Sequence, residues 1–170
     1  MNGIAVRPKL HHDAPHEYLV AEVYVDGIPL ADFSWFAISL EDLVASAKED
    51  GEFFILTCWC GIPECAGLSR GIEVRLGPKA VHWHVLEPEP ERRYVFRRDA
   101  YNRAIEQGIE SCRRWFAKQE RAGTLGSLDI RITPDHNHRF FGVPSRFHDT
   151  GNPNPYWQSP EGQEKTGEIV

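Results

Sequence analysis

The stretch RDAYNRAIEQGIESCRRWFAKQERAG, residues 98–123, predicts one long helix against which the rest of the chain must pack. Asp99 is a residue type favoured at helix N-caps, and Gly123 is suited to end the helix. About 22 helical residues would extend roughly 33 Å. The apolar positions recur at spacings of three and four, which places them on one face: Tyr101, Ile105, Ile109, Cys112 and Phe116.

The segments before this helix are typical of strands and of one shorter helix. EYLVAEVYVDGIPLADF, residues 17–33, alternates with the period of a strand and contains Asp26-Gly27, a favoured type I′ hairpin turn. SLEDLVASAKEDG, residues 39–51, predicts a helix with Ser39 as its N-cap and Asp42 as part of a capping box. Further strands are predicted at Phe53–Trp59, Gly71–Leu76, Ala80–Leu86, around Tyr94–Phe96 and at SLDIRI, residues 127–132.

This order of elements predicts an α+β fold. We expect a mostly antiparallel sheet of about six to seven strands with two helices packed on one face. Residues 1–16 are rich in Pro and His and are expected to form a loose N-terminal arm, followed by a single α+β domain over residues 17–132. Residues 133–170 are rich in Pro and Asn, and we expect an extended, partly packed segment in which DHNHRFFG, residues 135–142, is a loop.

Composition and charge narrow the class of protein. The chain has 170 residues, 41 % of them hydrophobic, and a formal net charge of −6, which argues against a general nucleic-acid binder. The sequence shows neither an apolar run that could span a membrane nor a signal-peptide pattern at its start. A cytoplasmic location is therefore expected, and clustered cysteines in that compartment favour metal binding or catalysis over disulfides.

The cysteine cluster lies in FFILTCWCGIPECAGL, residues 53–68. Cys58 and Cys60 would share a face if their segment is a strand, and the turn formers that follow them would let Cys65 return towards the pair. Three converging sulfurs can ligate Zn²⁺, which prefers four nitrogen or sulfur ligands. The same spacing is compatible with inert reduced thiols or with redox-active or catalytic thiols.

The fourth zinc ligand is left open by the sequence among Cys112, His82 and His84. Cys112 lies on the apolar stripe of the long helix, whereas the two histidines share one face of a predicted strand. An alternative hypothesis is a metal- or thiol-dependent enzyme in which the cysteine cluster acts together with His82 or His84. That hypothesis requires an open coordination position in a pocket.

The motif CWCGIPECAGL resembles the post-SET zinc motif of SET-domain lysine methyltransferases, C-x-C-G-x-x-x-C. In that family the three cysteines share a zinc ion with a fourth cysteine. The resemblance implies Cys58, Cys60 and Cys65 as ligands of a local zinc knuckle. It does not extend to the cofactor-binding segments of the methyltransferase, so it implies no methyl transfer.

The wider segment Leu56–Gly67 is similar to a motif of uncharacterised bacterial proteins, L-T-C-x-C-G-x-x-x-C-A-G. Some such small acidic α+β proteins resemble immunity proteins of toxin systems. An immunity-type protein that blocks a basic toxin is therefore one form of a non-enzymatic interaction protein that we consider.

The charge distribution is compatible with a basic protein partner. Residues 1–60 carry ten acidic and three basic side chains, and we expect the partner-binding face to include Glu41, Asp42, Glu49 and Asp50. The long-helix region is basic, but its interspersed glutamates favour an ion-paired surface over a nucleic-acid site. The sequence therefore predicts an interaction protein with a possible structural zinc, and it indicates neither the partner nor the oligomeric state.

Overall fold

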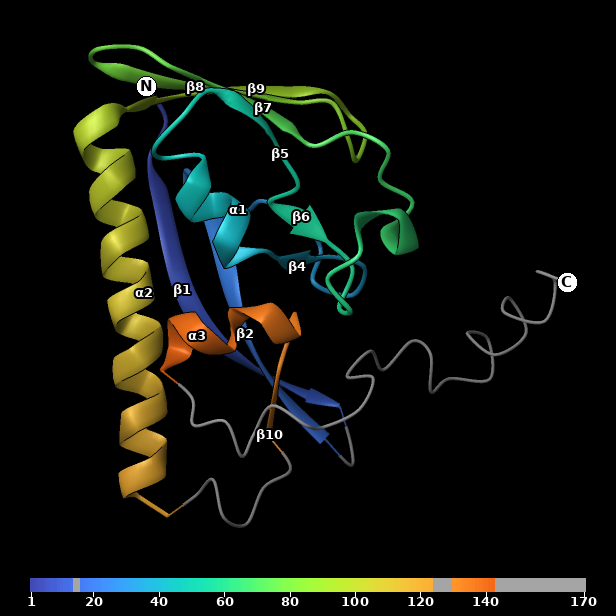
Figure 1. Cartoon of the computed structure of the whole chain (residues 1–170), viewed down its shortest axis with the longest axis vertical. Helices are drawn as coiled ribbons and strands as arrows, with labels where there is room; N and C mark the ends of the chain where they lie inside the picture. The colour runs from blue at the N-terminus through green and yellow to red at the C-terminus, as the bar shows by residue number, and fades with distance from the viewer. Residues whose placement is uncertain (14–15, 124–129, 143–170) are drawn as a thin grey trace, which may run out of the picture.

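The computed structural model describes residues 1–13, 16–123 and 130–142, and it has the expected α+β architecture (Figure 1). The strands are β1 (Ile4–Asp13), β2 (His16–Val25), β3 (Ile28–Pro29), β4 (Ala37–Ile38), β5 (Gly51–Phe53), β6 (Leu56–Thr57), β7 (Ile72–Leu76), β8 (Ala80–Val85), β9 (Arg92–Arg97) and β10 (Ile130–Ile132). The helical elements are α1 (Leu40–Ala45), η1 (Pro63–Ala66), α2 (Arg98–Arg121), η3 (Asp135–Asn137) and α3 (His138–Phe141).

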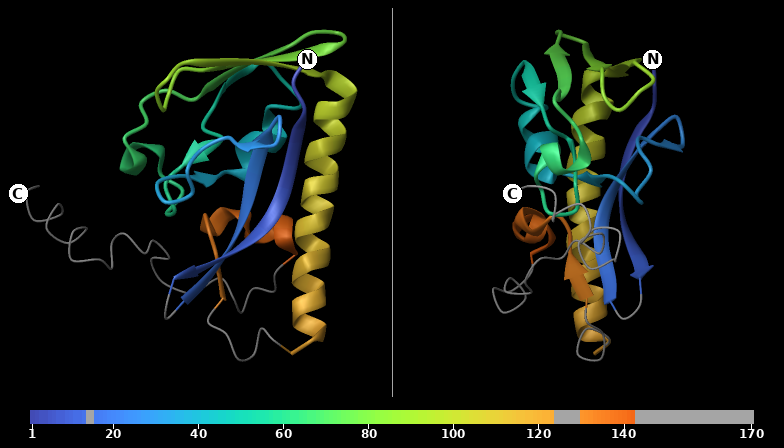
Figure 2. Two further views of the ribbon diagram at one scale, coloured as in Figure 1. Left: turned by 180° about the vertical axis from the view of Figure 1, so that it is seen from behind. Right: turned by 90° about the vertical axis from the view of Figure 1, so that its right-hand side faces the viewer.

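The strands form three sheets instead of the single sheet that we expected. One has the order β1-β2-β10 with β3 paired to β2, the second pairs β4 with β6, and the third has the order β5-β7-β8-β9. The paired strands are antiparallel except for β10, which runs parallel to β2. The prediction of mostly antiparallel pairing is therefore confirmed, and α2 lies along β1 in every view (Figure 2).

The N-terminal segment is a strand, which corrects the expectation of a loose arm for residues 1–16. Strand β1 pairs with β2 in an unbroken antiparallel register from Ile4↔Val25 to Asp13↔His16. Because β1 is the edge strand of its sheet, Pro8 can lack a backbone N–H without interrupting the interior of the ladder. The Pro and His content that indicated a loose arm is thus compatible with an edge strand.

Helix α2 forms where the sequence predicts it, although it begins earlier. Its N-cap is Arg97, and Asp99 lies in the first turn, where its carboxylate accepts hydrogen bonds from Arg97 and Arg103 at 2.8 and 2.9 Å. A carboxylate there is favourable because the helix N-terminus carries partial positive charge. The buried positions of α2 are Tyr101, Ile105, Gly108, Cys112 and Phe116. Four of the five predicted positions are therefore buried, Ile109 is partly buried at the edge of the core, and Gly108 joins the stripe.

Gly108 sets how closely α2 approaches β1. A Cβ atom at this position would lie 2.3 Å from the Cβ atom of Val6 and 3.0 Å from its carbonyl oxygen. Real Cβ atoms do not pack this closely, so α2 fits against β1 only because residue 108 has no side chain. The glycine that weakens the helix locally is therefore required by the packing.

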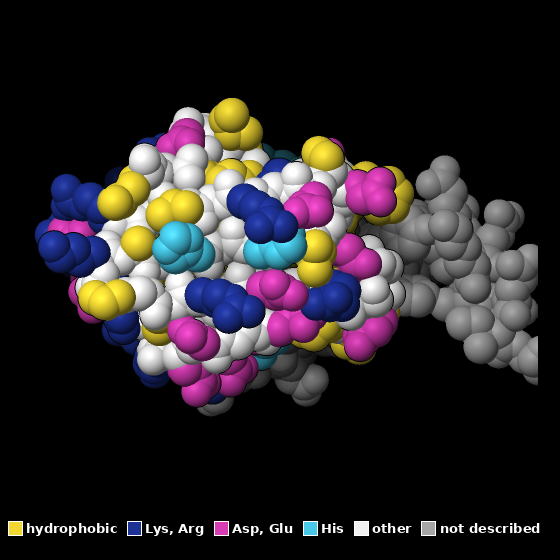
Figure 3. Space-filling model, turned by 90° about the horizontal axis from the view of Figure 1, so that it is seen from above, with side chains coloured by type: hydrophobic (Ala, Val, Ile, Leu, Met, Phe, Trp, Pro, Cys, Tyr) yellow, Lys and Arg dark blue, Asp and Glu magenta, His cyan; other side chains and the backbone are white. Residues whose placement is uncertain are grey.

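The core lies between α2, the first sheet and the inner face of the third sheet. Trp83 of β8 contacts Phe96 edge-on at a centroid distance of 5.1 Å and Tyr101 at 5.7 Å. The Tyr101 hydroxyl shares a buried hydrogen bond of 2.6 Å with the Ser46 hydroxyl, so its polar end is satisfied inside the core. The outer face of the third sheet, which contains β8, carries interspersed basic, acidic and histidine side chains (Figure 3).

The hairpin turn and the start of α1 are as predicted. Asp26 and Gly27 have φ values of 51° and 81°, the left-handed conformation that a type I′ turn requires. Ser39 is the N-cap of α1, and its hydroxyl accepts a hydrogen bond from the Asp42 amide. The helix ends at Ala45, well before Gly51, because Ser46 turns its hydroxyl back to the Leu43 carbonyl.

Two segments differ from the expectation in ways that matter for the site. The predicted strand Phe53–Trp59 is divided into β5 and β6, and it ends at Thr57, so the cysteines lie in the following loop. The start of the expected extended segment folds into η3 and α3 instead, with Phe141 and His138 buried. The remainder, residues 143–170, lies outside the described part of the chain.

Replacing Gly108 with Ala should destabilise the protein, although the same change stabilises most exposed helices. The new methyl group forces α2 away from β1, and such overpacking typically costs about 1–3 kcal/mol of unfolding free energy. Urea denaturation measures the loss. The neighbouring exposed change Gln107→Ala should stay within about 0.5 kcal/mol of wild type, and equal stability of Gly108→Ala and wild type would contradict the close approach.

Candidate metal centre

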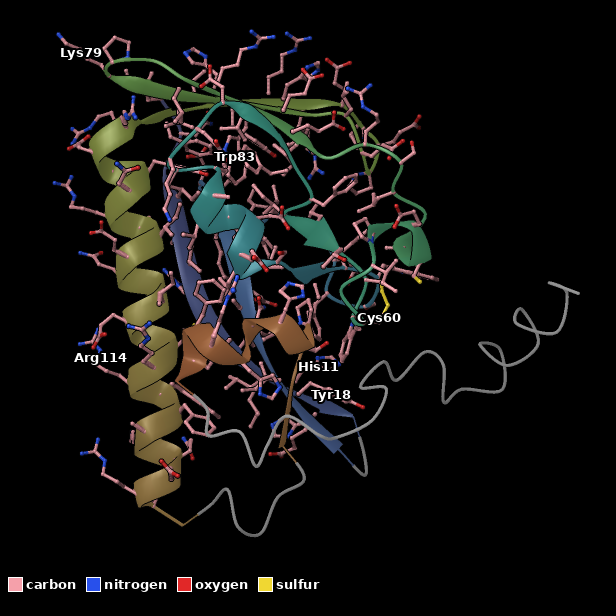
Figure 4. All side chains as sticks on the ribbon, viewed as in Figure 1. His11, Tyr18, Cys60, Lys79, Trp83 and Arg114 are labelled. Carbon is pink, nitrogen blue, oxygen red and sulfur yellow. A yellow bond between two sulfur atoms is a disulfide. The ribbon has the colours of Figure 1, made fainter. Side chains whose placement is uncertain are left out.

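The three clustered cysteines converge in the loop that follows β6. We define the cysteine turn as residues 58–65. The Sγ atoms of Cys58, Cys60 and Cys65 all lie within 4.8 Å of one another, and no other His, Cys, Asp or Glu of the described chain joins this group. Figure 4 shows Cys60 on the side of the molecule away from Arg114 of α2. The predicted convergence of the three sulfurs is therefore present.

The cysteine turn is closed by its own backbone. The Gly61 amide donates to the Cys58 carbonyl at 2.9 Å, and the Cys65 amide donates to the Ile62 carbonyl at 3.2 Å. Gly61 has a φ of 86°, a left-handed conformation that glycine adopts without strain. Pro63 begins η1 and fixes the backbone angle there, which directs Cys65 back towards the first two cysteines. The expected turn that returns Cys65 is therefore present, whereas Cys58 and Cys60 lie beyond the end of β6 and not on a strand as we expected.

The three sulfurs differ in exposure and bonding. Cys58 is buried, Cys60 is half-buried and Cys65 is exposed. Cys58 and Cys60 are joined in a disulfide with their Cα atoms 5.4 Å apart, and Cys65 is a free thiol. The Cys60 amide donates to the Cys58 sulfur at 3.2 Å, and such a donor stabilises a sulfur anion when the disulfide is reduced.

Residues 133–136, which are distant in the sequence, pack against the cysteine turn. The Thr133 hydroxyl donates a short hydrogen bond to the carbonyl of Trp59, and both groups are buried. A Cβ atom on Gly61 would lie 3.0 Å from the His136 ring and 3.4 Å from Pro134. The turn is therefore pressed against residues 133–136, and the shape of this contact leaves no room for a side chain at position 61.

His136 is itself held by the cap of α1. Its Nε2 atom lies 3.1 Å from the Ser39 hydroxyl, which donates its hydrogen to the Asp42 carboxylate at 2.7 Å. Because that hydroxyl has one hydrogen, His136 is the donor in this pair, and its Nδ1 edge faces Gly61. The sequence interpretation of DHNHRFFG as a loop missed this support, since histidine and asparagine carry no pattern that indicates a distant partner.

The three residues considered as a fourth zinc ligand lie elsewhere. Cys112 is buried on the core side of α2, and burial raises the pKa of its thiol to about 12. His82 and His84 lie on the outer face of β8, where His84 contacts Glu73 at 3.3 Å and Glu91 at 2.7 Å. None of the three belongs to the described cysteine group, so the corresponding part of the sequence hypothesis is not supported by their positions.

The acidic residues expected to bind a partner are largely engaged within the chain. Glu41 pairs with Arg139 at 2.6 Å, and both side chains are more than half exposed. The Asp42 carboxylate caps α1 through Ser39, and Asp50 accepts a hydrogen bond from the Leu76 amide at 2.6 Å. Glu49 is exposed. Glu41 and Glu49 are thus the two members of this set best placed to meet another molecule.

The donor set defines what the cysteine turn can do chemically. In the oxidised state, two sulfurs are consumed by the disulfide and one thiol faces the solvent. The grouping within 4.8 Å is that of the disulfide-bonded form; once the disulfide is reduced, all three sulfurs of the turn are free to bind a thiophilic cation, whose charge offsets the repulsion between thiolates. The residues present therefore fit a metal ion in the reduced state.

No family model, curated protein or solved structure matches this chain. Within the described residues, we find no helix with the length and apolar character needed to cross a membrane. The function must therefore be argued from the geometry alone.

Substitution of Gly61 by Ala should destabilise the cysteine turn more than the same change at Gly67. Both glycines have positive φ, which costs a non-glycine residue about 1–2 kcal/mol, but a Cβ atom at Gly67 would meet nothing within 4 Å. Gly67→Ala therefore measures backbone strain alone, and Gly61→Ala adds the collision with His136. The unfolding free energies are compared by urea denaturation.

The double variant Gly61→Ala/His136→Ala provides the control for this comparison. Removal of the imidazole should bring back part of the stability lost in Gly61→Ala, measured against His136→Ala alone. Equal losses at the two glycines would show that residues 133–136 do not press on the turn.

Proposed function

We propose that this chain is a non-enzymatic interaction protein in which the reduced cysteine turn holds a structural zinc ion. The observation that carries the proposal is the convergence of three sulfur atoms within 4.8 Å on a turn closed by its own backbone. A set of three sulfurs favours zinc or another thiophilic ion over magnesium or calcium, which prefer oxygen ligands. Zinc binding would order the loop between β6 and β7.

The position of the cluster supports a structural role for the metal. The main hydrophobic core is built from other elements, and from the cysteine turn only Trp59 joins the smaller second cluster, so zinc would add to a fold that exists without it. Cys65 is exposed, and a closed structural site needs a fourth protein ligand, so we place that ligand on the solvent side, as a side chain of a partner. The alternative of an enzyme assisted by His82 or His84 receives no support from geometry, because both lie on the outer face of β8.

The metal proposal predicts about one zinc ion per chain when the full protein is purified under reducing conditions without added metal. Cys58→Ser and Cys65→Ser should each lower the zinc content strongly, because each removes a ligand. Cys112→Ala is the matched control and should retain the metal, since its thiol lies in the core. Elemental analysis by mass spectrometry gives the stoichiometry.

Oxidation supplies a second arm of the same experiment. Forming the Cys58–Cys60 disulfide removes two ligands, so oxidised protein should release its zinc and take it up again after reduction. Added Co²⁺ should give a sulfur-to-cobalt charge-transfer band only with the reduced protein. Reduced wild-type protein that contains no zinc and gives no such band would overturn the proposal.

The interaction part of the proposal concerns a basic protein partner, as for an immunity-type protein that blocks a toxin. Its support is the acidic composition of residues 1–60 together with the exposure of Glu41 and Glu49 beside α1. Asp42 and Asp50 accept hydrogen bonds within the chain, whereas the Glu41–Arg139 pair is solvent-exposed and open to competition by a basic partner, so we confine the expected face to Glu41 and Glu49. Long-range attraction of this kind mainly raises the association rate and weakens with salt.

Reversing the charge of this face with the double substitution Glu41→Lys and Glu49→Lys should abolish salt-sensitive co-purification of a basic protein from the native cells. The control Glu106→Lys with Glu110→Lys changes the net charge equally on the exposed side of α2 and should leave co-purification intact. Zinc content should be the same in all three proteins. Retention of the partner by the first variant, or its loss from both, would refute this face.

A further inference from the structure

A second site lies on the opposite face of β2 from α2, and none of the clustered cysteines lines it. An open groove of about 530 Å³ is lined there by residues from β1, β2, β9 and the loop that follows β3. A volume in this range suits a small molecule. The polar residues of the groove are Lys9, His11, Glu22, Asp32, Ser34 and Arg92.

Glu22 forms the buried part of the groove. Its side chain alternates with Ala21 and Val23, which face the core, and it is only 7 % exposed. One carboxylate oxygen accepts a hydrogen bond from the Lys9 ammonium at 2.9 Å, and the other accepts one from the Tyr24 hydroxyl. The hydrogen bond to Glu22 raises the pKa of both Lys9 and Tyr24, so both donors keep their protons.

Glu22 is the buried member of this group, since the Lys9 side chain is half exposed and Tyr24 is partly buried. A buried carboxylate needs hydrogen-bond donors, and Lys9 and Tyr24 supply them at the edge of the groove. Glu22 and Lys9 cancel each other's charge, so they supply a polar floor without net charge.

Arg92 supplies a cation whose charge is not cancelled. It reaches the groove from β9, and its guanidinium is held by the Leu30 carbonyl at 2.7 Å and the Pro88 carbonyl at 3.4 Å. No carboxylate of the described chain forms an ion pair with it, and its buried Nε atom has no hydrogen-bond partner there. A fixed guanidinium of this kind is suited to bind a carboxylate.

Asp32 supplies an anion that lines the same groove. It follows by two residues Leu30, whose carbonyl accepts a hydrogen bond from the Arg92 guanidinium. The Asp32 side chain accepts a hydrogen bond from the Ser34 amide, which lowers the pKa of its carboxyl group and keeps it ionised. The ring of Phe33, against which His11 packs at a centroid distance of 4.6 Å, lines the same groove.

We propose that this groove binds a free α-amino acid as its zwitterion. The carboxylate of the ligand meets Arg92, its ammonium group meets Asp32, and an apolar side chain lies against the wall formed by Phe33 and His11. A zwitterion carries both of the charges for which the groove offers a partner, a guanidinium for its carboxylate and a carboxylate for its ammonium group. The site requires no metal and no disulfide, so it stands whether or not the cysteine turn binds zinc.

The test uses the full chain and L-phenylalanine as the probe, with binding followed by amide chemical shifts in NMR and by calorimetry. Saturable binding is expected, with shifts in residues 29–34 and around Arg92. N-acetyl-L-phenylalanine lacks the ammonium group and L-phenylalanine amide lacks the carboxylate. Each should bind about tenfold more weakly or worse, because one charged hydrogen bond is lost.

Variants assign the two charges. Asp32→Asn preserves the hydrogen bond to Ser34, since an amide oxygen also accepts, and it should weaken L-phenylalanine binding about tenfold with unchanged thermal stability. Arg92→Gln should weaken it similarly, whereas Arg93→Gln, on the outer face of β9, should not. Absence of saturable binding, equal binding of the analogues, or indifference to Asp32→Asn would overturn the proposal.

Discussion

The side chain of Asn137 links the segment that packs against the cysteine turn to the start of α1. It is fully buried, its oxygen accepts a hydrogen bond from the Leu40 amide at 2.9 Å, and its nitrogen donates to the Ile38 carbonyl at 2.8 Å. The first amides of a helix lack partners within the helix, so Asn137 satisfies one of them where no water can reach. One amide group thereby joins the last described helical segment to the junction of β4 and α1.

This constraint explains why a turn near residue 60 depends on residues near 135. His136, next to Asn137, binds the cap of α1 on one side and presses on Gly61 on the other. Thr133 binds the Trp59 carbonyl from the same segment. Two sets of contacts therefore hold the turn that carries the cysteines. One is its own backbone hydrogen bonds, and the other is the packing of residues 133–136, which Asn137 anchors to α1.

The contrast between what the sequence predicted and what it did not follows from the range of the interactions. The α2 stripe, the turn at Asp26-Gly27 and the Ser39 cap depend on residues a few positions apart, and each was predicted. Strand β1 and the contacts of residues 133–137 depend on partners far along the chain, which short-range sequence patterns do not reveal.

The two candidate sites show the same limit. The convergence of the three sulfurs was predicted from their spacing, but on the assumption that Cys58 and Cys60 lie on a strand, and that strand ends before them. The groove was missed because its charges come from β1, β2, β9 and a loop, and only the fold brings them together.

Trp59 connects the two candidate sites physically. It lies between two of the clustered cysteines in the sequence, and its indole N–H donates to the Phe33 carbonyl at 3.0 Å. Its ring packs on Phe33 at a centroid distance of 4.3 Å and on His11 at 5.6 Å, both of which line the groove. Closely packed interiors transmit small displacements, because few voids exist to absorb them. The backbone conformation at Cys58 and Cys60 therefore helps to set the position of the groove wall, and the two sites share one supporting side chain.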